Sequence, residues 1–185
     1  MRYEYKHLFV FKQLVFPPLF KPIFAANSSI LKPFIELYTD GAASGNPGPG
    51  GFGTVLKYGK FRKEIYAGFR KTTNNRMELL AVIIGLESIT NKDLDVNIYS
   101  DSKYVVDAIN LKWIYGWQKK GFETKANPDL WQRFIRVYNP LKHKFFWVKG
   151  HASNVENNRC DELAVAASKM PNLLIDVGYE ERAKK

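Results

Sequence analysis

The sequence predicts an α/β protein in which helices cover a mixed β-sheet. Three strand-like runs joined by hairpin-type turns come first, at about 34–40, 52–58 and 61–69. Strand-like and helix-like segments then alternate, which is the pattern of parallel strands connected through helices. The chain has 185 residues, 45% of them hydrophobic and 25% charged, which is enough for one domain with a hydrophobic core.

The first strand is the one around which we expect the fold to be organised. An apolar run from Ile35 leads to Asp40, and a turn rich in glycine, asparagine and proline follows over 41–51. Asp40 is therefore expected to end the strand, where the chain leaves the core. An ionised carboxylate at such a place needs a cation, a metal ion or solvent, and no basic residue lies within six positions of it.

Hydrophobic periodicity and helix-start signals predict the later elements. Thr73 and the two asparagines after it are typical of a helix start, and Met77, Leu80 and Ile84 follow at helical spacing. No strong pattern follows Pro171. The expected elements are a helix at 76–90, a strand at 94–99, a helix from 101 to about 110, a helix at 128–138, a strand at 144–148 and a helix at 157–169.

Residues 1–32 differ in composition from the rest. They contain five Lys or Arg and one Glu, which is +4 of the formal net charge of +10 and leaves +6 for 33–185. Prolines interrupt every helical period, and the apolar part is too short for a membrane span. A signal peptide, an organelle transit peptide and residues upstream of the true start stay open. We expect a poorly ordered basic extension over 1–32, a folded domain over 33–179 and a charged tail over 180–185.

Charge and potential ligands narrow the class of function. A pI near 9.6 favours a polyanionic partner, most often nucleic acid or a membrane surface, over an ordinary basic surface. The single cysteine, Cys160, excludes an internal disulfide and is typical of a reducing compartment, so we expect a cytoplasmic protein with Cys160 in its core. With three histidines, a Cys/His zinc site is nearly excluded, whereas a hard cation on carboxylates stays open.

Four carboxylates lie at the boundaries of the expected elements. Asp40 ends the first strand, Asp101 follows the fourth, and Glu78 and Asp161 fall in the first turns of two helices. Acids that cap helix N-termini explain each of the last three singly. As a set they match the oxygen ligands that Mg²⁺ requires, and two ions ~3.5–4 Å apart can hold both oxygens of a phosphoryl displacement. Ligand sites in such sheets lie at the carboxyl ends of parallel strands.

A cluster of aromatic and basic residues covers 112–125. Trp117, Lys119 and Lys120 suit a nucleic-acid strand, with an aromatic face against sugars or bases and ammonium groups against phosphates. Trp113 fits equally well on an amphipathic helix that packs its tryptophans.

Five sequence blocks together resemble type I ribonuclease H of the bacterial kind. They occur in the family's order between about Phe34 and Tyr179 and include all four acids and a Gly-His pair. The blocks are Tyr38–Ala42 with Gly45–Gly51, Thr73–Leu79, Tyr99–Val105, Trp147–His151, and Asn157 with Cys160–Ala164.

The resemblance implies the ribonuclease H-like fold, an α/β fold whose five-stranded mixed sheet has the order 3-2-1-4-5 and is flanked by helices. Residues 33–179 would be its catalytic domain. The implied activity is that of a hydrolase, an Mg²⁺-dependent endonuclease that cuts the RNA strand of RNA–DNA hybrids and leaves 5′-phosphate and 3′-hydroxyl ends. Two Mg²⁺ ions per site, for which Mn²⁺ can substitute, and a monomer without membrane association are also implied.

The resemblance also assigns roles to residues. It maps the metal ligands onto the four acids and gives His151 a part in proton transfer or product departure. It places the basic handle that grips the DNA strand at Trp117, Lys119 and Lys120, and it carries Asn46, Asn74 and Asn157 over as substrate contacts. Asn75 is a further neutral donor–acceptor near the acids and suits RNA 2′-hydroxyls in the same way. The full set of candidate site residues is Asp40, Glu78, Asp101, Asp161, His151, Asn46, Asn74, Asn75, Asn157, Trp117, Lys119 and Lys120.

Three rival functions stay open on the sequence. A transposase or integrase on the same fold would cut DNA, but such sites typically have fewer acids and no Gly-His loop. A hybrid-binding module without catalysis would lack an acid, and none is missing. A small basic scaffold protein leaves the acidic set unexplained.

Overall fold

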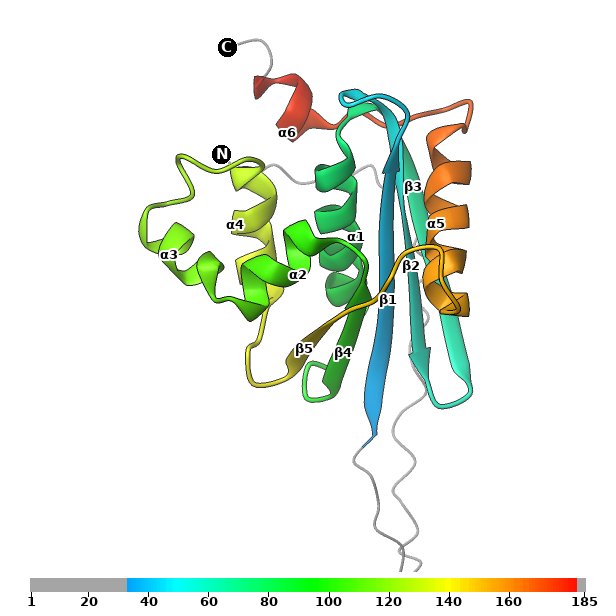
Figure 1. Cartoon of the computed structure of the whole chain (residues 1–185), viewed down its shortest axis with the longest axis vertical. Coiled ribbons are helices and arrows are strands. Elements are labelled where there is room, and N and C mark those ends of the chain that lie inside the picture. The colour runs from blue at the N-terminus through cyan, green and yellow to red at the C-terminus, as the bar shows by residue number, and fades with distance from the viewer. Residues whose placement is uncertain (1–32, 183–185) are drawn as a thin grey trace, which may run out of the picture. The chain divides into compact units, whose positions relative to one another are not determined.

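The computed structural model describes residues 33–182, so the expectations for 1–32 and for 183–185 lie outside the described residues. Three strands come first, and helices and strands then alternate (Figure 1). The strands are β1 (Phe34–Ala43), β2 (Gly48–Tyr58), β3 (Phe61–Thr72), β4 (Asp95–Ser100) and β5 (His143–Trp147). The helices are α1 (Asn74–Ser88), α2 (Lys103–Asn110), α3 (Trp113–Lys119), α4 (Pro128–Val137), α5 (Val155–Ser168) and α6 (Val177–Glu180).

The strands form one mixed sheet in the order β3-β2-β1-β4-β5, which confirms the predicted fold class and order. β1 pairs antiparallel with β2 and parallel with β4, and β4 pairs parallel with β5. The carboxyl ends of β1, β4 and β5 therefore lie at the same end of the sheet, which is where such sheets bind ligands.

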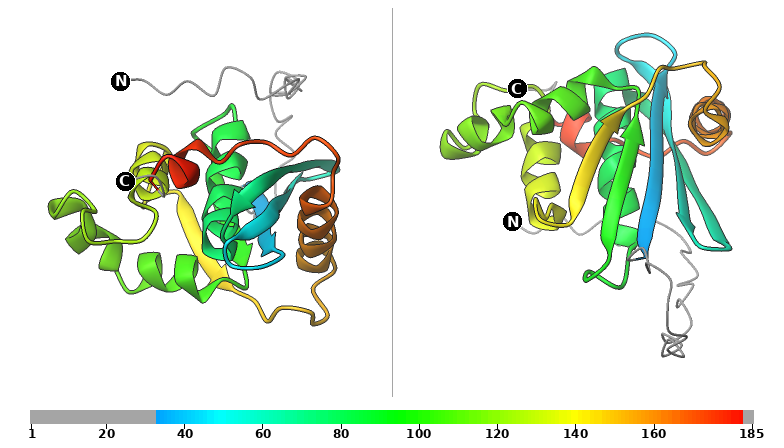
Figure 2. Two further views of the ribbon diagram at one scale, coloured as in Figure 1. Left: turned by 90° about the horizontal axis from the view of Figure 1, so that it is seen from above. Right: turned by 60° about the horizontal axis from the view of Figure 1, so that its bottom comes forward.

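Helices cover the two faces of the sheet unequally. α5 packs on β1, β2 and β3 from one side, whereas α1 packs on β1 and β2 from the other and has α4 beside it (Figure 2). Where α5 does not cover β4 and β5, Tyr99 is half-buried and Phe146 is exposed. On the side of the sheet that carries α5, β4 and β5 are thus open to solvent.

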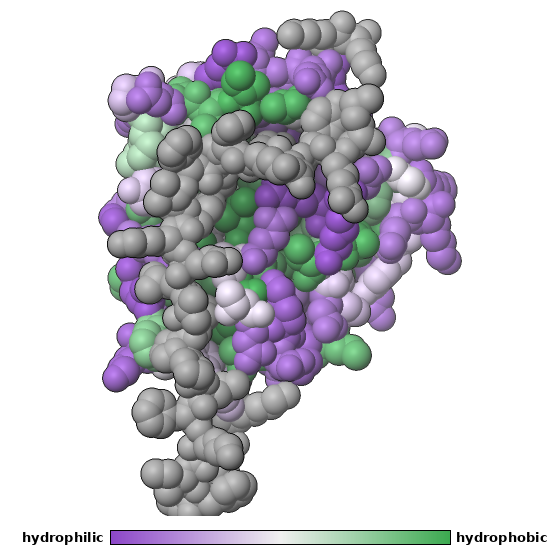
Figure 3. Space-filling view, turned by 180° about the vertical axis from the view of Figure 1, so that it is seen from behind, coloured by the Kyte–Doolittle hydropathy of each residue, from purple (hydrophilic) through white to green (hydrophobic). Residues whose placement is uncertain are grey.

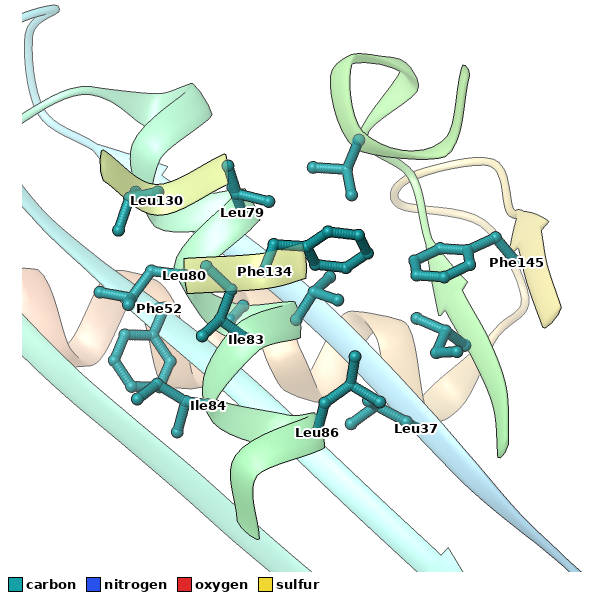
Figure 4. Close-up of a cluster of buried hydrophobic side chains, with 14 of the residues drawn as sticks. Leu37, Phe52, Leu79, Leu80, Ile83, Ile84, Leu86, Leu130, Phe134 and Phe145 are labelled. Atoms are coloured by element: carbon teal, nitrogen blue, oxygen red, sulfur yellow. The ribbon is translucent and has the colours of Figure 1, made fainter. Parts of the chain in front are cut away.

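The main hydrophobic core lies between the sheet and helices α1, α2 and α4 (Figure 4). Leu37 from β1, Ile83 from α1, Phe134 from α4 and Phe145 from β5 meet there. A smaller cluster lies under α5 and contains Tyr38, Val55, Cys160 and Leu163. Cys160 is fully buried, as predicted.

Element boundaries differ from the expectation at three acids. β1 continues to Ala43, so Asp40 lies inside the strand and not at its end. α1 begins at Asn74 and α5 at Val155, which puts Glu78 and Asp161 in the second helical turn and not in the first. Helix capping therefore does not explain these acids, because free N–H groups belong to the first turn.

The segment after Pro171 is more ordered than its sequence pattern indicated. Leu174 forms a parallel bridge with Phe69, and its backbone exchanges hydrogen bonds with Gly68 and Arg70 of β3. The short helix α6 follows, with Asp176 as its N-cap. Long-range pairing, which leaves no local period in the sequence, orders this segment.

Hydrophilic residues surround smaller hydrophobic patches on the face seen from behind (Figure 3). Large exposed hydrophobic side chains include Phe61 on β3 (42% exposed) and Phe146 on β5 (41% exposed), which lie on the two edge strands.

None of the helices within 33–182 has the length and apolar character that crossing a membrane requires.

Candidate active site

Parallel pairing of β1 with β4 brings two aspartates together. Thr39 pairs with Ser100, so Asp40 and Asp101 follow side by side. Asp40 is 7% exposed, and its carboxylate accepts a hydrogen bond from the Gly41 N–H at 2.7 Å. Burial, and after it the negative charge of Asp101, raises the pKa of Asp40 to about 8.

Glu78 joins this pair from α1. A Cβ at position 41 would overlap the backbone of Met77 and Glu78, so β1 and α1 come this close only because residue 41 is glycine. The Glu78 carboxylate accepts hydrogen bonds from the Ser102 hydroxyl and from the Asn74 amide, the latter at 2.7 Å. Burial, with a further contribution from Asp101, raises the pKa of Glu78 to about 7.

The segment from β5 to α5 supplies the remaining groups. His151 has a left-handed backbone, with φ of 51°, and its side chain is 81% exposed. Its Nδ1 lies 3.9 Å from the Asp161 carboxylate. A Cβ on Gly150 would overlap the Asp101 carboxylate, so this loop lies directly against the acids.

The acids fit a divalent cation by their chemistry. Within 33–182, Asp40, Glu78 and Asp101 form no ion pair with a lysine or arginine, and the negative charges of Asp101, Asp161 and Glu78 each raise the pKa of Asp40. A cation would remove this repulsion, and carboxylate oxygens are the ligands that Mg²⁺ prefers. In the described part of the chain, no three ligating side chains lie close enough together to hold a metal ion. The acids therefore fit a divalent cation by the type of their donor atoms and by their charge.

The four asparagines occupy different positions around the acids. Asn74 bonds to Glu78, and its backbone N–H donates to Asn46 Oδ1 at 3.4 Å, whereas Asn75 is exposed. Burial raises the pKa of Asp101, and the Asn157 amide opposes this rise. Asn157 is 1% exposed, and neither of its amide atoms completes a hydrogen bond within 33–182. Asn157 thus has hydrogen-bonding capacity left beside the acids.

The basic handle lies apart from the acids, on α3, which packs against α2 (Figure 1). Trp117 is half-buried, with its ring centroid 5.4 Å from that of Trp131 and with the Lys125 ammonium 5.2 Å above it. Trp113 is 49% exposed, and Lys119 is exposed, as is Lys120. Trp117 therefore packs more closely than Trp113 does.

A second group of acids centres on Arg76, which precedes Glu78 by two residues on α1. Arg76 is 1% exposed, and its Nε and Nη2 each donate to Asp176 at 2.7 Å. Nη1 and Nη2 donate to Asp129 at 2.9 and 2.8 Å, and Asp176 also accepts from Thr72 at 2.6 Å. This guanidinium joins α1 to the start of α4 and to the C-terminal segment.

The geometry can be compared with known proteins. The RNase H family model matches residues 32–169. The chain belongs to the ribonuclease H family. It is 56% identical over 148 residues to a ribonuclease H of Desulforamulus reducens, covering 77% of this chain and 92% of the relative. It is 50% identical over 153 residues to that of Rippkaea orientalis, covering 80% and 93%.

Solved structures of ribonucleases H share the fold. LC9-RNase H1, described as a type 1 RNase H with the type 2 active-site motif, superposes with a TM-score of 0.66 at 31% identity, covering 85% of this chain and 84% of its own. LC11-RNase H1, solved in complex with an RNA/DNA hybrid, superposes with a TM-score of 0.51 at 27% identity, covering 72% and 95%.

Four further residues support the site of this ribonuclease H and were not predicted from its sequence. Ser102 holds Glu78, Gly150 contacts Asp101, and Trp147 donates from Nε1 to the Asp101 carbonyl at 3.0 Å. Arg76 anchors the start of α1. All four lie inside the family-like blocks, but their partners are distant in sequence and leave no local signal.

Proposed function

We propose that this ribonuclease H hydrolyses the RNA strand of RNA–DNA hybrids by two-metal-ion catalysis, with Asp40, Glu78, Asp101 and Asp161 as the metal ligands. The products would carry 5′-phosphate and 3′-hydroxyl ends, and Mn²⁺ would substitute for Mg²⁺. The observation that carries the proposal is that acids from separate elements come close to the buried Asp40: burial, and after it the charges of Asp101, Asp161 and Glu78, raise the pKa of this carboxyl. A monomer in the cytoplasm is part of the same proposal.

When bound, divalent cations would supply the charge neutralisation and water activation that phosphodiester hydrolysis needs. The chain's own residues orient the ligands. The Gly41 N–H holds Asp40, and Ser102 and Asn74 hold Glu78, so both carboxylates have fixed directions. Pre-set ligand directions reduce the reorganisation needed during the reaction.

His151 has the freedom that a proton carrier needs. Its imidazole is exposed on a loop and lies 3.9 Å from the Asp161 carboxylate, so it reaches both solvent and the group of acids. We assign to it proton transfer to the departing 3′ oxygen, or assistance to product departure.

Substrate selection would come from two separate surfaces. Asn46, Asn74, Asn75 and Asn157 would contact RNA 2′-hydroxyls, and the unsatisfied Asn157 amide supports this assignment. Lys119 and Lys120 would bind DNA phosphates, with Trp117 in the same handle. Changing both lysines to alanine should flatten the slope of log affinity against log salt by up to about two units, with turnover at saturating hybrid unchanged.

One set of reactions tests the proposal. The protein is incubated with labelled RNA–DNA hybrid, RNA duplex or DNA duplex, each with Mg²⁺, Mn²⁺ or EDTA, and the product ends are identified. We expect cleavage of the RNA strand of the hybrid alone, dependent on the metal. Cleavage of the DNA duplex would favour a transposase-like enzyme, and binding without cleavage would leave only a hybrid-binding module.

A further inference from the structure

Three aromatic rings form a continuous stack across the open part of the α5 face. Tyr38, Tyr99 and Phe146 occupy equivalent positions on β1, β4 and β5. The ring centroids of Tyr38 and Tyr99 are 4.7 Å apart with an interplanar angle of 16°, and those of Tyr99 and Phe146 are 5.2 Å apart at 22°. Near-parallel rings at these spacings attract one another, so each ring holds the orientation of the next.

The stack has one closed end and one open end. Tyr38 is 8% exposed and packs with the residues under α5, whereas Phe146 is 41% exposed on β5, an edge strand of the sheet. In the described part of the chain, Phe146 has a ring partner on one side only, Tyr99. A further flat ring that stacks on the exposed part of Phe146 would extend the series.

The stack lies directly beside the carboxylates. Asp40 follows Tyr38 by two residues within β1, so this acid lies on the same face of the sheet as the tyrosine. Asp101 comes directly after the end of β4, the strand that carries Tyr99. Phe146 is one strand spacing and two residues away from Asp101, or roughly 8 Å, which is a little over two nucleotide steps of ~3.4 Å. A strand held at the acids can therefore extend to Phe146.

Charge on this edge favours a polyanion. Lys144 precedes Phe146 by two residues on the same face of β5, and Lys149 follows in the loop. Both are exposed, and neither forms an ion pair with any residue between 33 and 182. Strand pairing aligns Lys144 with Asn97 on β4 and, two strands away, with Glu36 on β1. The Glu36 carboxylate accepts a hydrogen bond from the Tyr38 hydroxyl at 3.0 Å.

We propose that Phe146 is a stacking platform for an unpaired nucleobase, in a single-stranded extension that continues from the hybrid, with Lys144 and Lys149 on its phosphates. An aromatic face beside free lysines is the arrangement that binds single-stranded nucleic acid without sequence preference. The preferred substrate is then a hybrid with a single-stranded flank. The inference rests on the proposed function for the position of the hybrid at the acids.

The test measures affinity in EDTA, where cleavage does not interfere. The full chain is titrated with blunt RNA–DNA hybrid and with hybrids extended by a few nucleotides at either end of the RNA or of the DNA strand. We expect one extension to tighten binding by about fivefold or more. An abasic extension, which keeps the phosphates but has no bases, should lose most of this gain. The strand whose extension tightens binding is the strand, RNA or DNA, that supplies the stacked base.

Variants locate the effect on the protein. Phe146→Ala and Phe146→Leu should both remove the gain from the extension, while Phe146→Trp should keep it. Phe61→Ala is the matched control, because Phe61 is equally exposed on the opposite edge strand, and it should keep the full gain. The leucine variant retains an apolar side chain, so a loss there reports on the ring and not on folding.

Three results would overturn the platform: equal affinity for blunt and extended hybrids in the parent protein, a full gain in Phe146→Leu, or an equal loss in Phe61→Ala. Different results would contradict the proposed function, so the two proposals can be told apart. Cleavage of blunt hybrid with Mg²⁺ and no response to extensions would remove only the platform. A Phe146-dependent response without any cleavage would remove only the enzymatic assignment.

Discussion

Arg76 and Glu78 lie within one turn of α1, yet they belong to two groups of acids that are built in opposite ways. Around Arg76, Asp129 and Asp176 share a buried guanidinium through four donor–acceptor contacts of 2.7–2.9 Å. Around Asp40, acids face one another with no lysine or arginine ion-paired to Asp40, Glu78 or Asp101 among residues 33–182. In the first group, a guanidinium of the chain neutralises the acids. In the second group, no cation of the chain does so, and a bound cation could.

The contrast shows in the pKa values. Arg76 holds the pKa of the Asp129 carboxyl below its usual range despite burial, whereas burial and neighbouring acids raise the pKa of Asp40 to about 8 and that of Glu78 to about 7. A buried carboxylate is thus structural when a guanidinium is paired with it and functional when only like charges surround it. Four variants or conditions test this distinction.

Asp40→Asn should have the largest effect. Removing one charge from a metal ligand should lower hybrid cleavage at millimolar Mg²⁺ by at least ~10³-fold, since metal catalysis supplies several kcal/mol. The metal-free protein should keep its fold and gain stability, because a repulsion is relieved. Near-normal turnover would exclude Asp40 as a ligand.

Asp176→Asn makes the same chemical change in the compensated group and should act in the opposite direction. It leaves part of the buried Arg76 charge unpaired, so the free energy of unfolding should fall by roughly 3 kcal/mol. Glu162→Gln is the control, because its carboxylate is 63% exposed and loss of its surface pair with Arg159 should cost less than about 1 kcal/mol. Equal denaturation midpoints for the two variants would contradict the distinction.

His151→Ala should act on the rate alone. An exposed group that assists proton transfer should cost roughly 10–10³-fold in turnover, with hybrid affinity and melting temperature close to the parent values. Weaker binding at unchanged turnover would instead make His151 a substrate contact.

The pH dependence of stability should show the smallest effect. Because the folded pKa values of Asp40 and Glu78 are raised, the folded state binds more protons than the unfolded state between about pH 4 and pH 8. Without divalent metal, stability should therefore decline as pH rises through this window, by about 1 kcal/mol or more. Urea titrations in EDTA measure it, and the decline should be smaller in Asp40→Asn. A rise in stability over this range would contradict the raised pKa values of the two acids.

Local pattern was sufficient to predict most of the fold. Alternating and helical periodicity placed the strands and the longer helices near their observed positions, and the family-like blocks implied the order of the sheet. These features depend on residues close in sequence, whose apolar spacing records which face is buried. The same patterns misplaced the end of β1 and the starts of α1 and α5, because helix and strand ends depend on packing more than on spacing.

The sequence by itself determined which acids this protein has and the order in which they occur. Only the tertiary structure decided what each acid faces. Arg76 meets Asp176 across 100 residues, β1 touches α1 through Gly41, and Phe146 extends a stack that begins at Tyr38. The physical reason is that the state of a charge or a ring depends on its partners in space, and strand register and helix packing bring those partners together from distant parts of the chain.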